Sequence, residues 1–173
     1  DADPAAVECW LAACVDKAEV GDAVVAQSET QAQKLWALRE CISEAQKIEG
    51  ISIKHDIAVP VSAIPDFLKR ADAALAEAFP GIRVVAFGHV GDGNLHYNIL
   101  LGPEPKTEDI NACVHRVVTE FGGSISAEHG IGRYRRADLL LNKTAEEIAL
   151  MRRMKAMMDP TGLMNPDAVL SND

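Results

Sequence analysis

The sequence predicts an α+β domain in which an antiparallel sheet carries helices on one face and further helices follow at the C-terminus. Four segments have the apolar alternation or apolar runs of strands, and about five have the three- and four-residue apolar spacing of amphipathic helices. The 173 residues, 48% hydrophobic and 25% charged, suffice for one core. We find no internal repeat or low-complexity tract, so we expect one domain over residues 1–173.

The first 50 residues favour helices. Asp3-Pro4 is a typical helix start. The apolar face of this first helix consists of Val7, Trp10, Leu11 and Cys14. We expect a short strand at 23–26, and then a capping box of Ser28 and Gln31 that opens a helix running to about Lys47. The apolar positions of this long helix are Leu35, Leu38, Ile42 and Ala45.

The central part of the chain predicts the sheet. Residues 51–59 alternate, so we expect a half-buried strand with Lys54 and Asp56 pointing away from its apolar face. A helix follows Pro60, and its inward residues are Ile64, Phe67, Leu68, Ala71, Leu75 and Phe79. The apolar runs 83–89 and 95–101 are joined by a glycine-rich turn and form a hairpin.

Two helices are expected in the C-terminal third. Thr107 can cap the first, which ends at Gly122-Gly123. Its apolar residues are Ile110, Val114, Val117 and Phe121. A capping box of Thr144 and Glu147 opens the last helix, which ends at 159–162. The methionines of this helix have the spacing of packing residues.

Two histidines bracket the hairpin turn. If the turn is centred between Asp92 and Gly93, His89 directly faces His96, with Cβ atoms roughly 4.5 to 5.5 Å apart. Both imidazoles could then bind one ion, although a turn one residue longer on one side breaks this register. Asn98 shares the face of His96 and adds a polar group there.

Glu128 and His129 form a second polar cluster, embedded among small residues within 124–132. Two histidines and one carboxylate are a common ligand set for catalytic zinc or another divalent ion. The sequence therefore predicts a metal site of His89, His96 and Glu128. The alternative is that the two histidines are a polar pair on the sheet while Glu128 and His129 cap a helix.

Composition excludes some classes of function. The net charge of -9 argues against a nucleic-acid-binding surface, and an anionic ligand would need local cations. The four cysteines have neither zinc-knuckle spacing nor the density of a disulfide scaffold. No segment approaches the roughly 20 apolar residues of a membrane span, and nothing resembles a signal peptide. We expect a cytoplasmic protein, and the start without Met suggests a domain of a longer chain.

Three segments together resemble the C-terminal domain of FAD-linked oxidases, in the vanillyl-alcohol oxidase class of flavoproteins. They are Phe87 to Asn98, Gly123 to Gly132, and Met154 to Pro166. The family includes the D-lactate and D-2-hydroxyglutarate dehydrogenases and the glycolate oxidase D subunit. The resemblance implies a ferredoxin-like substrate domain that works with FAD. It also implies the reaction, in which a D-2-hydroxy acid is oxidised to the 2-oxo acid and its hydride passes to FAD.

The resemblance also implies roles for individual residues. It implies zinc ligands at His89, His96 and Glu128, and a base that takes the hydroxyl proton at His129. Residues similar to the family's substrate-carboxylate ligands are Arg39, Ser43 and Lys54. Arg39 and Ser43 are four residues apart and so share one helical face.

The flavin of such proteins is held mainly by an N-terminal domain, whose glycine-rich phosphate-binding segment has no counterpart in these residues. Asn165 is the candidate cofactor neighbour in this chain. The tail here reads Asn165-Pro166-Asp167-Ala168, where the family has Asn-Pro-Gly-Lys.

Other readings stay open at this point. The chain could be a free-standing metal-binding or regulatory module without redox activity, or a zinc hydrolase. The sequence leaves open which hydroxy acid and which electron acceptor are used. An apolar last helix favours a homodimer or contact with a flavin domain. We expect His55 to be a hydrogen-bonded core residue and His115 to be solvated on its helix.

Overall fold

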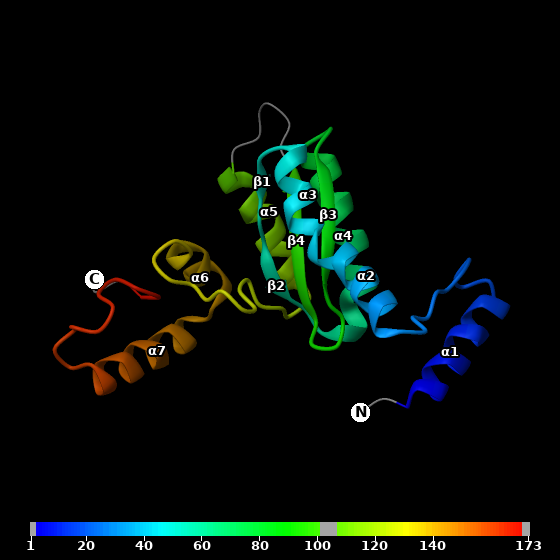
Figure 1. Ribbon diagram of the computed structural model, residues 1–173. Helices are drawn as coiled ribbons and strands as arrows, with labels where there is room; N and C mark the ends of the chain where they lie inside the picture. The colour runs from blue at the N-terminus through cyan, green and yellow to red at the C-terminus, as the bar shows by residue number, and fades with distance from the viewer. Residues whose placement is uncertain (1–2, 101–106, 171–173) are drawn as a thin grey trace. The chain divides into compact units, whose positions relative to one another are not determined.

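The computed structural model describes residues 3–100 and 107–170 (Figure 1). The chain divides into two compact units, residues 1–48 and 49–173, which are taken separately below. The described residues combine α-helices with a four-stranded antiparallel sheet, which confirms the predicted α+β class. Within these residues, no helix has the length and apolar character needed to cross a bilayer.

The first unit contains helices α1 (Pro4–Asp16), α2 (Glu29–Glu40) and most of α3 (Ile42–Glu49). The predicted cap of α1 is confirmed, because the Asp3 carboxylate accepts a hydrogen bond from the amide of Ala5 at 3.1 Å. Ser28 caps α2 by accepting from the Gln31 amide at 3.3 Å. The Gln31 side chain accepts from the amide of Gln27, one residue before the partner expected in a capping box.

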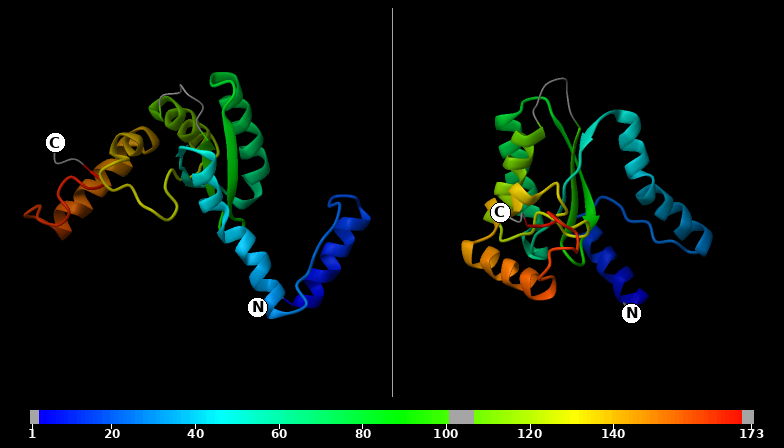
Figure 2. Two further views of the ribbon diagram at one scale, coloured as in Figure 1. Left: turned by 45° about the horizontal axis from the view of Figure 1, so that its top comes forward. Right: turned by 90° about the vertical axis from the view of Figure 1, so that its left-hand side faces the viewer.

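Two expectations for the first unit are wrong. Residues 23–26 form no strand, and they lie in an irregular segment between α1 and α2 (Figure 2). The expected long helix is interrupted at Cys41, which separates α2 from α3. The apolar faces of both helices are also largely exposed, with Trp10 of α1 63% and Leu38 of α2 72% accessible. Helical spacing predicts a helix, but burial of its apolar face also requires a packing partner.

The second unit contains the sheet. Its strands are β1 (Ser52–Ile53), β2 (Asp56–Ala58), β3 (Arg83–His89) and β4 (Asn94–Leu100). Strand β4 pairs antiparallel with β3 along one side and with β1 and β2 along the other. The predicted single strand over 51–59 is thus two short strands, separated at Lys54 and His55.

Two long helices, α4 (Ile64–Ala78) and α5 (Thr107–Glu120), lie behind the sheet in Figure 1. A 3₁₀ turn, Val61–Ala63, precedes α4. The chain order is therefore strand, helix, two strands, helix, followed by a single antiparallel bridge between Ala58 and Ser124. This is the ferredoxin-like order of a split βαβ motif, with the last strand reduced to one bridge.

The core lies between the sheet and these two helices. The predicted inward residues of α4 are buried or partly buried, and those of α5 are as well. The strands contribute Ile53, Ile57, Leu95, Tyr97 and Ile99. Because alternate residues of a strand point to opposite faces, the residues between them lie on the other face of the sheet.

The predicted facing of His89 and His96 is wrong. In the structure, His89 pairs with Asn94, and His96 pairs with Phe87. The connection is a four-residue loop, 90–93, in which the amides of Asp92 and Gly93 both donate to the carbonyl of His89. The register shift is two residues, so the two histidines still share one face of the sheet, diagonally.

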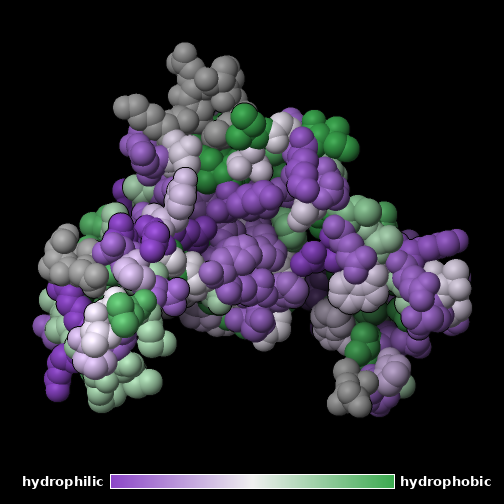
Figure 3. Space-filling view, turned by 60° about the vertical axis from the view of Figure 1, so that its left-hand side comes forward, coloured by the Kyte–Doolittle hydropathy of each residue, from purple (hydrophilic) through white to green (hydrophobic). Residues whose placement is uncertain are grey.

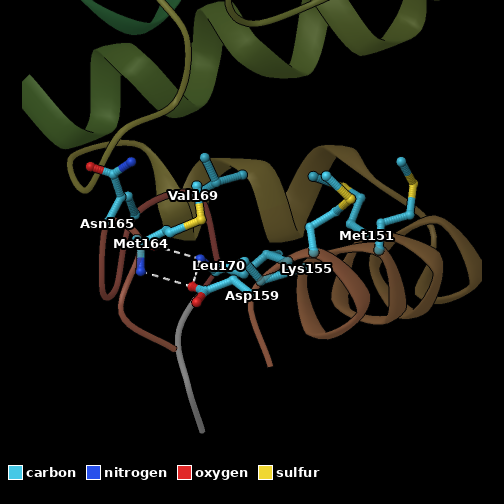
Figure 4. A pocket seen from close by; sticks show the side chains of 10 residues that line it. Met151, Lys155, Asp159, Met164, Asn165, Val169 and Leu170 are labelled. Carbon is cyan, nitrogen blue, oxygen red and sulfur yellow. Dashed lines mark hydrogen bonds and ion pairs between the residues drawn. The ribbon is translucent and has the colours of Figure 1, made fainter. Parts of the chain in front are cut away.

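The C-terminal part contains α6 (Arg136–Asn142), which the sequence did not predict, and α7 (Ala145–Met158). The capping box of Thr144 and Glu147 is present in both directions, as predicted. Beyond α7, the carboxylate of Asp159 accepts hydrogen bonds from the amides of Leu163 and Met164. The tail thereby turns back along α7. Between the two lies a cavity of about 450 Å³ that is open to solvent and lined largely by methionines and aliphatic residues (Figure 4).

Two buried histidines lie on the helix side of the sheet. His55 is a hydrogen-bonded core residue as predicted, with Nδ1 2.9 Å from the carbonyl oxygen of Tyr97 and Nε2 2.9 Å from the side-chain oxygen Oδ1 of Asn111. His115 was expected to be solvated, and this is wrong, because only 3% of it is exposed. It lies against His55 and 3.4 Å from Asp138 of α6, a helix that the sequence pattern did not reveal.

Acid should destabilise the protein through His55. Burial, and then the neighbouring His115, lower the pKa of His55 from 6.5 to about 4. The unfolded chain therefore binds more protons than the folded one between these values, and stability falls as the pH falls from 6.5 towards 4. We expect urea unfolding to show a loss of about 2 kcal/mol between pH 7 and 5.

The matched variants are His55→Gln, which should lose most of this acid dependence, and His89→Gln, which changes an exposed histidine and should retain it. Wild-type stability that does not change over this pH range would show that His55 does not become protonated on unfolding.

Candidate functional site

The polar face of the sheet lies opposite α4 and α5. Asn94, His96 and Asn98 alternate along β4 with the core residues Leu95, Tyr97 and Ile99. Asp56 of β2 is paired directly with His96, so its side chain belongs to the same polar face. This face therefore carries a carboxylate, an imidazole and two amides on adjacent strands.

Asp56 accepts several hydrogen bonds on this face, and only 2% of it is exposed. Its Oδ1 accepts a hydrogen bond from the side-chain amide of Asn94 at 2.9 Å. Its Oδ2 accepts from the backbone amides of Glu128 and His129, both at 2.9 Å. Burial by itself raises the pKa of Asp56, but these hydrogen bonds and the nearby His129 ring together hold the pKa below its ordinary value. Asp56 is thus a buried carboxylate kept in its charged form.

These bonds fix the loop that carries Glu128 and His129. The loop begins at the edge of the sheet, where Ala58 and Ser124 exchange two backbone hydrogen bonds. Gly123 allows this approach, because a Cβ there would lie 2.4 Å from the carbonyl oxygen of Ala58. The amide of Ala127 then donates to the backbone carbonyl of Asp56 at 3.1 Å.

Arg135 supports the loop from its other end. Its guanidinium donates to the carbonyl oxygen of Ile125 at 2.6 Å and to that of Lys54 at 3.3 Å. Glu128 and His129 lie in this loop and not at the start of a helix, since α6 begins only at Arg136. The alternative in which they cap a helix is therefore wrong.

Three predicted histidines gather beside Asp56. The ring centroids of His89 and His96 are 6.0 Å apart, and those of His96 and His129 are 6.4 Å apart. Phe87 packs against His96 with a centroid separation of 5.0 Å. The Nδ1 atom of His129 lies 3.5 Å from Oδ2 of Asp56. The imidazoles therefore come from β3, β4 and the loop, and the carboxylate of β2 lies next to the last of them.

The structure does not show the predicted metal site. Two imidazoles that share one tetrahedral ion have ring centroids roughly 5 Å apart, so the His89 and His96 rings are close to that arrangement. Glu128 lies in the loop with an exposed side chain. In residues 3–100 and 107–170, no group of three histidine, cysteine, aspartate or glutamate side chains is arranged to hold a metal ion.

The predicted substrate ligands divide between the two units. Asn98 is buried on the polar face of β4, and Lys54 is exposed between β1 and β2. Arg39 lies in the last turn of α2, while Ser43 follows on α3, beyond the interruption at Cys41. The structure thus brings Asn98 and Lys54 into the unit of the histidines and leaves Arg39 and Ser43 in the other unit.

Asn165, the predicted cofactor neighbour, lines the cavity beside α7 and has a positive φ of 47° (Figure 4). The tail around it is tied to the end of the histidine loop, because the amide of Val169 donates to the carbonyl of Gly132 at 2.7 Å. Arg133 donates to the carbonyl of Pro166 at 2.9 Å. The tail therefore contacts the loop that carries Glu128 and His129.

Sequence reasoning missed Asp56, Asn94 and Arg135. Asp56 was predicted only to point away from the apolar face, which it does, but its burial was not foreseen. A lone aspartate within an alternating apolar strand was the available signal, because a carboxylate there requires partners. Hydrophilic residues also predominate over the middle of the surface in the space-filling view (Figure 3).

Known proteins place this chain in a family. The family model described as "FAD linked oxidases, C-terminal domain" matches residues 1–169. The D-2-hydroxyglutarate dehydrogenase of Stutzerimonas stutzeri is 43% identical over 166 residues, which are 91% of this chain and 35% of that protein. That of Xanthomonas citri pv. viticola is 42% identical, over 96% of this chain and 36% of that protein.

The mitochondrial D-2-hydroxyglutarate dehydrogenase of Danio rerio is 40% identical over 89% of this chain and 29% of that protein. The chain thus spans about a third of the length of these curated relatives. The resemblance predicted from the hairpin, the Glu-His loop and the tail is confirmed. The chain belongs to the family of FAD-linked oxidase C-terminal domains.

Proposed function

We propose that this chain is the substrate-binding part of a flavin-dependent dehydrogenase that oxidises a D-2-hydroxy acid. The observation that carries the proposal is the cluster of His89, His96 and His129 beside the buried charge of Asp56. Relatives that are 40% to 43% identical are named D-2-hydroxyglutarate dehydrogenases, so this hydroxy acid is the first substrate to test. We further propose that FAD is held mainly by another domain, since those relatives are about three times as long.

The reaction removes a proton from the hydroxyl group and a hydride from C2, and bound FAD supplies the hydride acceptor. The residue of this chain suited to take the hydroxyl proton is His129. Its imidazole is 66% exposed, so a substrate can reach it, and imidazole is an effective base near neutral pH. The proton moves from the hydroxyl oxygen to a ring nitrogen of His129, and the O–H bonding electrons stay on oxygen.

The substrate carboxylate needs cations, because the chain as a whole has a net charge of -9. Lys54 has an exposed side chain in the unit of the histidines, and its backbone carbonyl is held by Arg135. We propose that Lys54 binds the carboxylate and that Asn98 supports the polar face. Arg39 and Ser43, in the first unit, are proposed as carboxylate ligands on the family resemblance alone.

We also propose that His89, His96 and Glu128 bind one divalent ion, with zinc the first candidate. All three are ligand types that zinc accepts, and the two imidazoles already share a sheet face. Glu128 is fixed at its backbone by Asp56, so its side chain starts next to that face. A bound ion of this kind makes a hydroxyl group easier to deprotonate.

Metal content is measured on the 173-residue chain by mass spectrometry after equilibration with zinc and dialysis. We expect about one ion per chain, and loss of that ion in the His89→Ala, His96→Ala double variant. The control is Cys41→Ala, which removes an exposed thiol that could bind zinc adventitiously and should leave the stoichiometry unchanged. A wild-type chain that retains no ion would refute the metal site and leave the histidines as hydrogen-bonding groups.

Activity is measured in a hybrid in which this chain replaces the matching third of the Stutzerimonas stutzeri enzyme. We expect D-2-hydroxyglutarate, and not its L enantiomer, to reduce the bound flavin under anaerobic conditions. His129→Ala should slow this reduction by roughly 10²-fold or more. Glu146→Gln, on the exposed surface of α7, should leave the rate unchanged.

The hybrid decides between a dehydrogenase and a module without redox activity. FAD content and circular dichroism first establish that the hybrid is folded and loaded. A loaded hybrid whose flavin stays oxidised with D-2-hydroxyglutarate, D-lactate and similar acids would contradict the proposal and favour the metal-binding or regulatory module.

A further inference from the structure

The contact between Asp56 and His129 has a geometry that anchoring of the loop alone does not require. The backbone amides of Glu128 and His129 already bind Oδ2 of Asp56, which is sufficient to hold the loop on the sheet. The Nδ1 atom of the His129 ring nevertheless lies 3.5 Å from the same oxygen. One carboxylate oxygen thus binds the backbone amide of His129 and also lies close to its ring.

We infer that Asp56 is a positioning residue for His129, which it holds in the tautomer with hydrogen on Nδ1 so that Nε2 faces the substrate hydroxyl. The inference rests on the proposed role of His129 as the base. It adds a residue that neither the family resemblance nor the sequence pattern identified.

The charge of Asp56 decides the tautomer. A carboxylate in its charged form only accepts hydrogen bonds, so the ring nitrogen beside it is favoured when it carries hydrogen. Asp56 is 2% exposed, and water therefore competes little for its oxygens. In the neutral ring, hydrogen on Nδ1 leaves the lone pair on Nε2, the nitrogen that can accept a proton.

The carboxylate is itself held rigidly. The Asn94 side chain donates to Oδ1 of Asp56 at 2.9 Å, so both oxygens are bonded and the group has little freedom to rotate. Asn94 is itself held in place, because its backbone N–H donates to the Asp92 carboxylate in the hairpin loop. The hairpin, the strand and the histidine loop thus fix one another through Asp56.

Other residues on this face are less suited to the same role. Glu128 has an exposed side chain in the loop itself, and Asp92 is exposed and accepts from the amide of Asn94. His96 lies beside His129, with the rings tilted by 30° and their centroids 6.4 Å apart. It limits where the His129 ring can lie, but it carries no negative charge that could attract the ring N–H. Among the described residues, Asp56 is the buried carboxylate next to this ring.

The tautomer is read directly from the ring nitrogens by long-range ¹H–¹⁵N NMR on the ¹⁵N-labelled 173-residue chain, without flavin or substrate. The spectrum is recorded at pH about 8.5, where the two neutral tautomers of an imidazole can be compared. We expect the Nδ1 resonance of His129 at the position of a protonated nitrogen and the Nε2 resonance at that of a bare nitrogen. A predominant Nε2–H tautomer, which an imidazole in water favours, would overturn the inference in the wild-type chain alone.

Two variants separate ring positioning from loop anchoring. Asp56→Asn replaces the carboxylate with an amide whose NH₂ group also donates, and His129 should shift towards the Nε2–H tautomer. Ser124→Ala removes a hydroxyl that bonds to Ser126 within the same loop, and His129 should keep the Nδ1–H tautomer. A shift in Ser124→Ala as large as that in Asp56→Asn would assign the effect to the loop and not to the carboxylate.

Because this measurement needs no turnover, it fails or succeeds independently of the proposed function. Hydrogen on Nδ1 in a chain whose flavin hybrid is inactive would keep the positioning role and refute the dehydrogenase. Hydrogen on Nε2 in a chain whose flavin hybrid is active would keep the dehydrogenase and refute the positioning role.

Discussion

The buried charge of Asp56 is the interaction on which the polar side of this structure depends. A carboxylate that is 2% exposed is costly unless hydrogen bonds replace its water, and three donors from two separate segments do so here. Those donors join the β3–β4 hairpin and the 124–132 loop to β2. The same bonds bring His129 next to His96, while the pairing of β3 with β4 places His89 on that face as well.

The sheet separates this polar face from the core. Strand alternation sends Leu95, Tyr97 and Ile99 towards α4 and α5 and leaves His96 and Asn98 on the other side. Two glycines let the connecting segments approach the sheet, because a Cβ at Gly93 would lie 2.0 Å from the carbonyl oxygen of Val59 and one at Gly123 would be similarly obstructed. The candidate site therefore rests on a rigid, well-packed layer and is assembled from loops that only glycine permits.

Local patterns predicted the core helices α4 and α5 and the caps of α1, α2 and α7, because amphipathic spacing and capping residues act within a few positions. The gathering of His89, His96 and His129 was also foreseen, but the register of the hairpin was wrong by two residues, since turn length depends on backbone bonds that spacing does not reveal. Asp56 was missed as an anchor because its partners lie 72 and 73 residues away and are backbone amides. His115 was misplaced for a similar reason, since it is covered by the unpredicted helix α6.

The central claim is that Asp56 holds the backbone of the histidine loop, and amide hydrogen exchange on the 173-residue chain tests it most directly. The amides of Glu128 and His129 donate to a buried carboxylate, so they should exchange far more slowly than the amide of the exposed neighbour Gly130. That pattern would establish the anchor in solution. Equally fast exchange at all three positions would show that the loop is not bound to Asp56, and the account of the site built on that bond would be wrong.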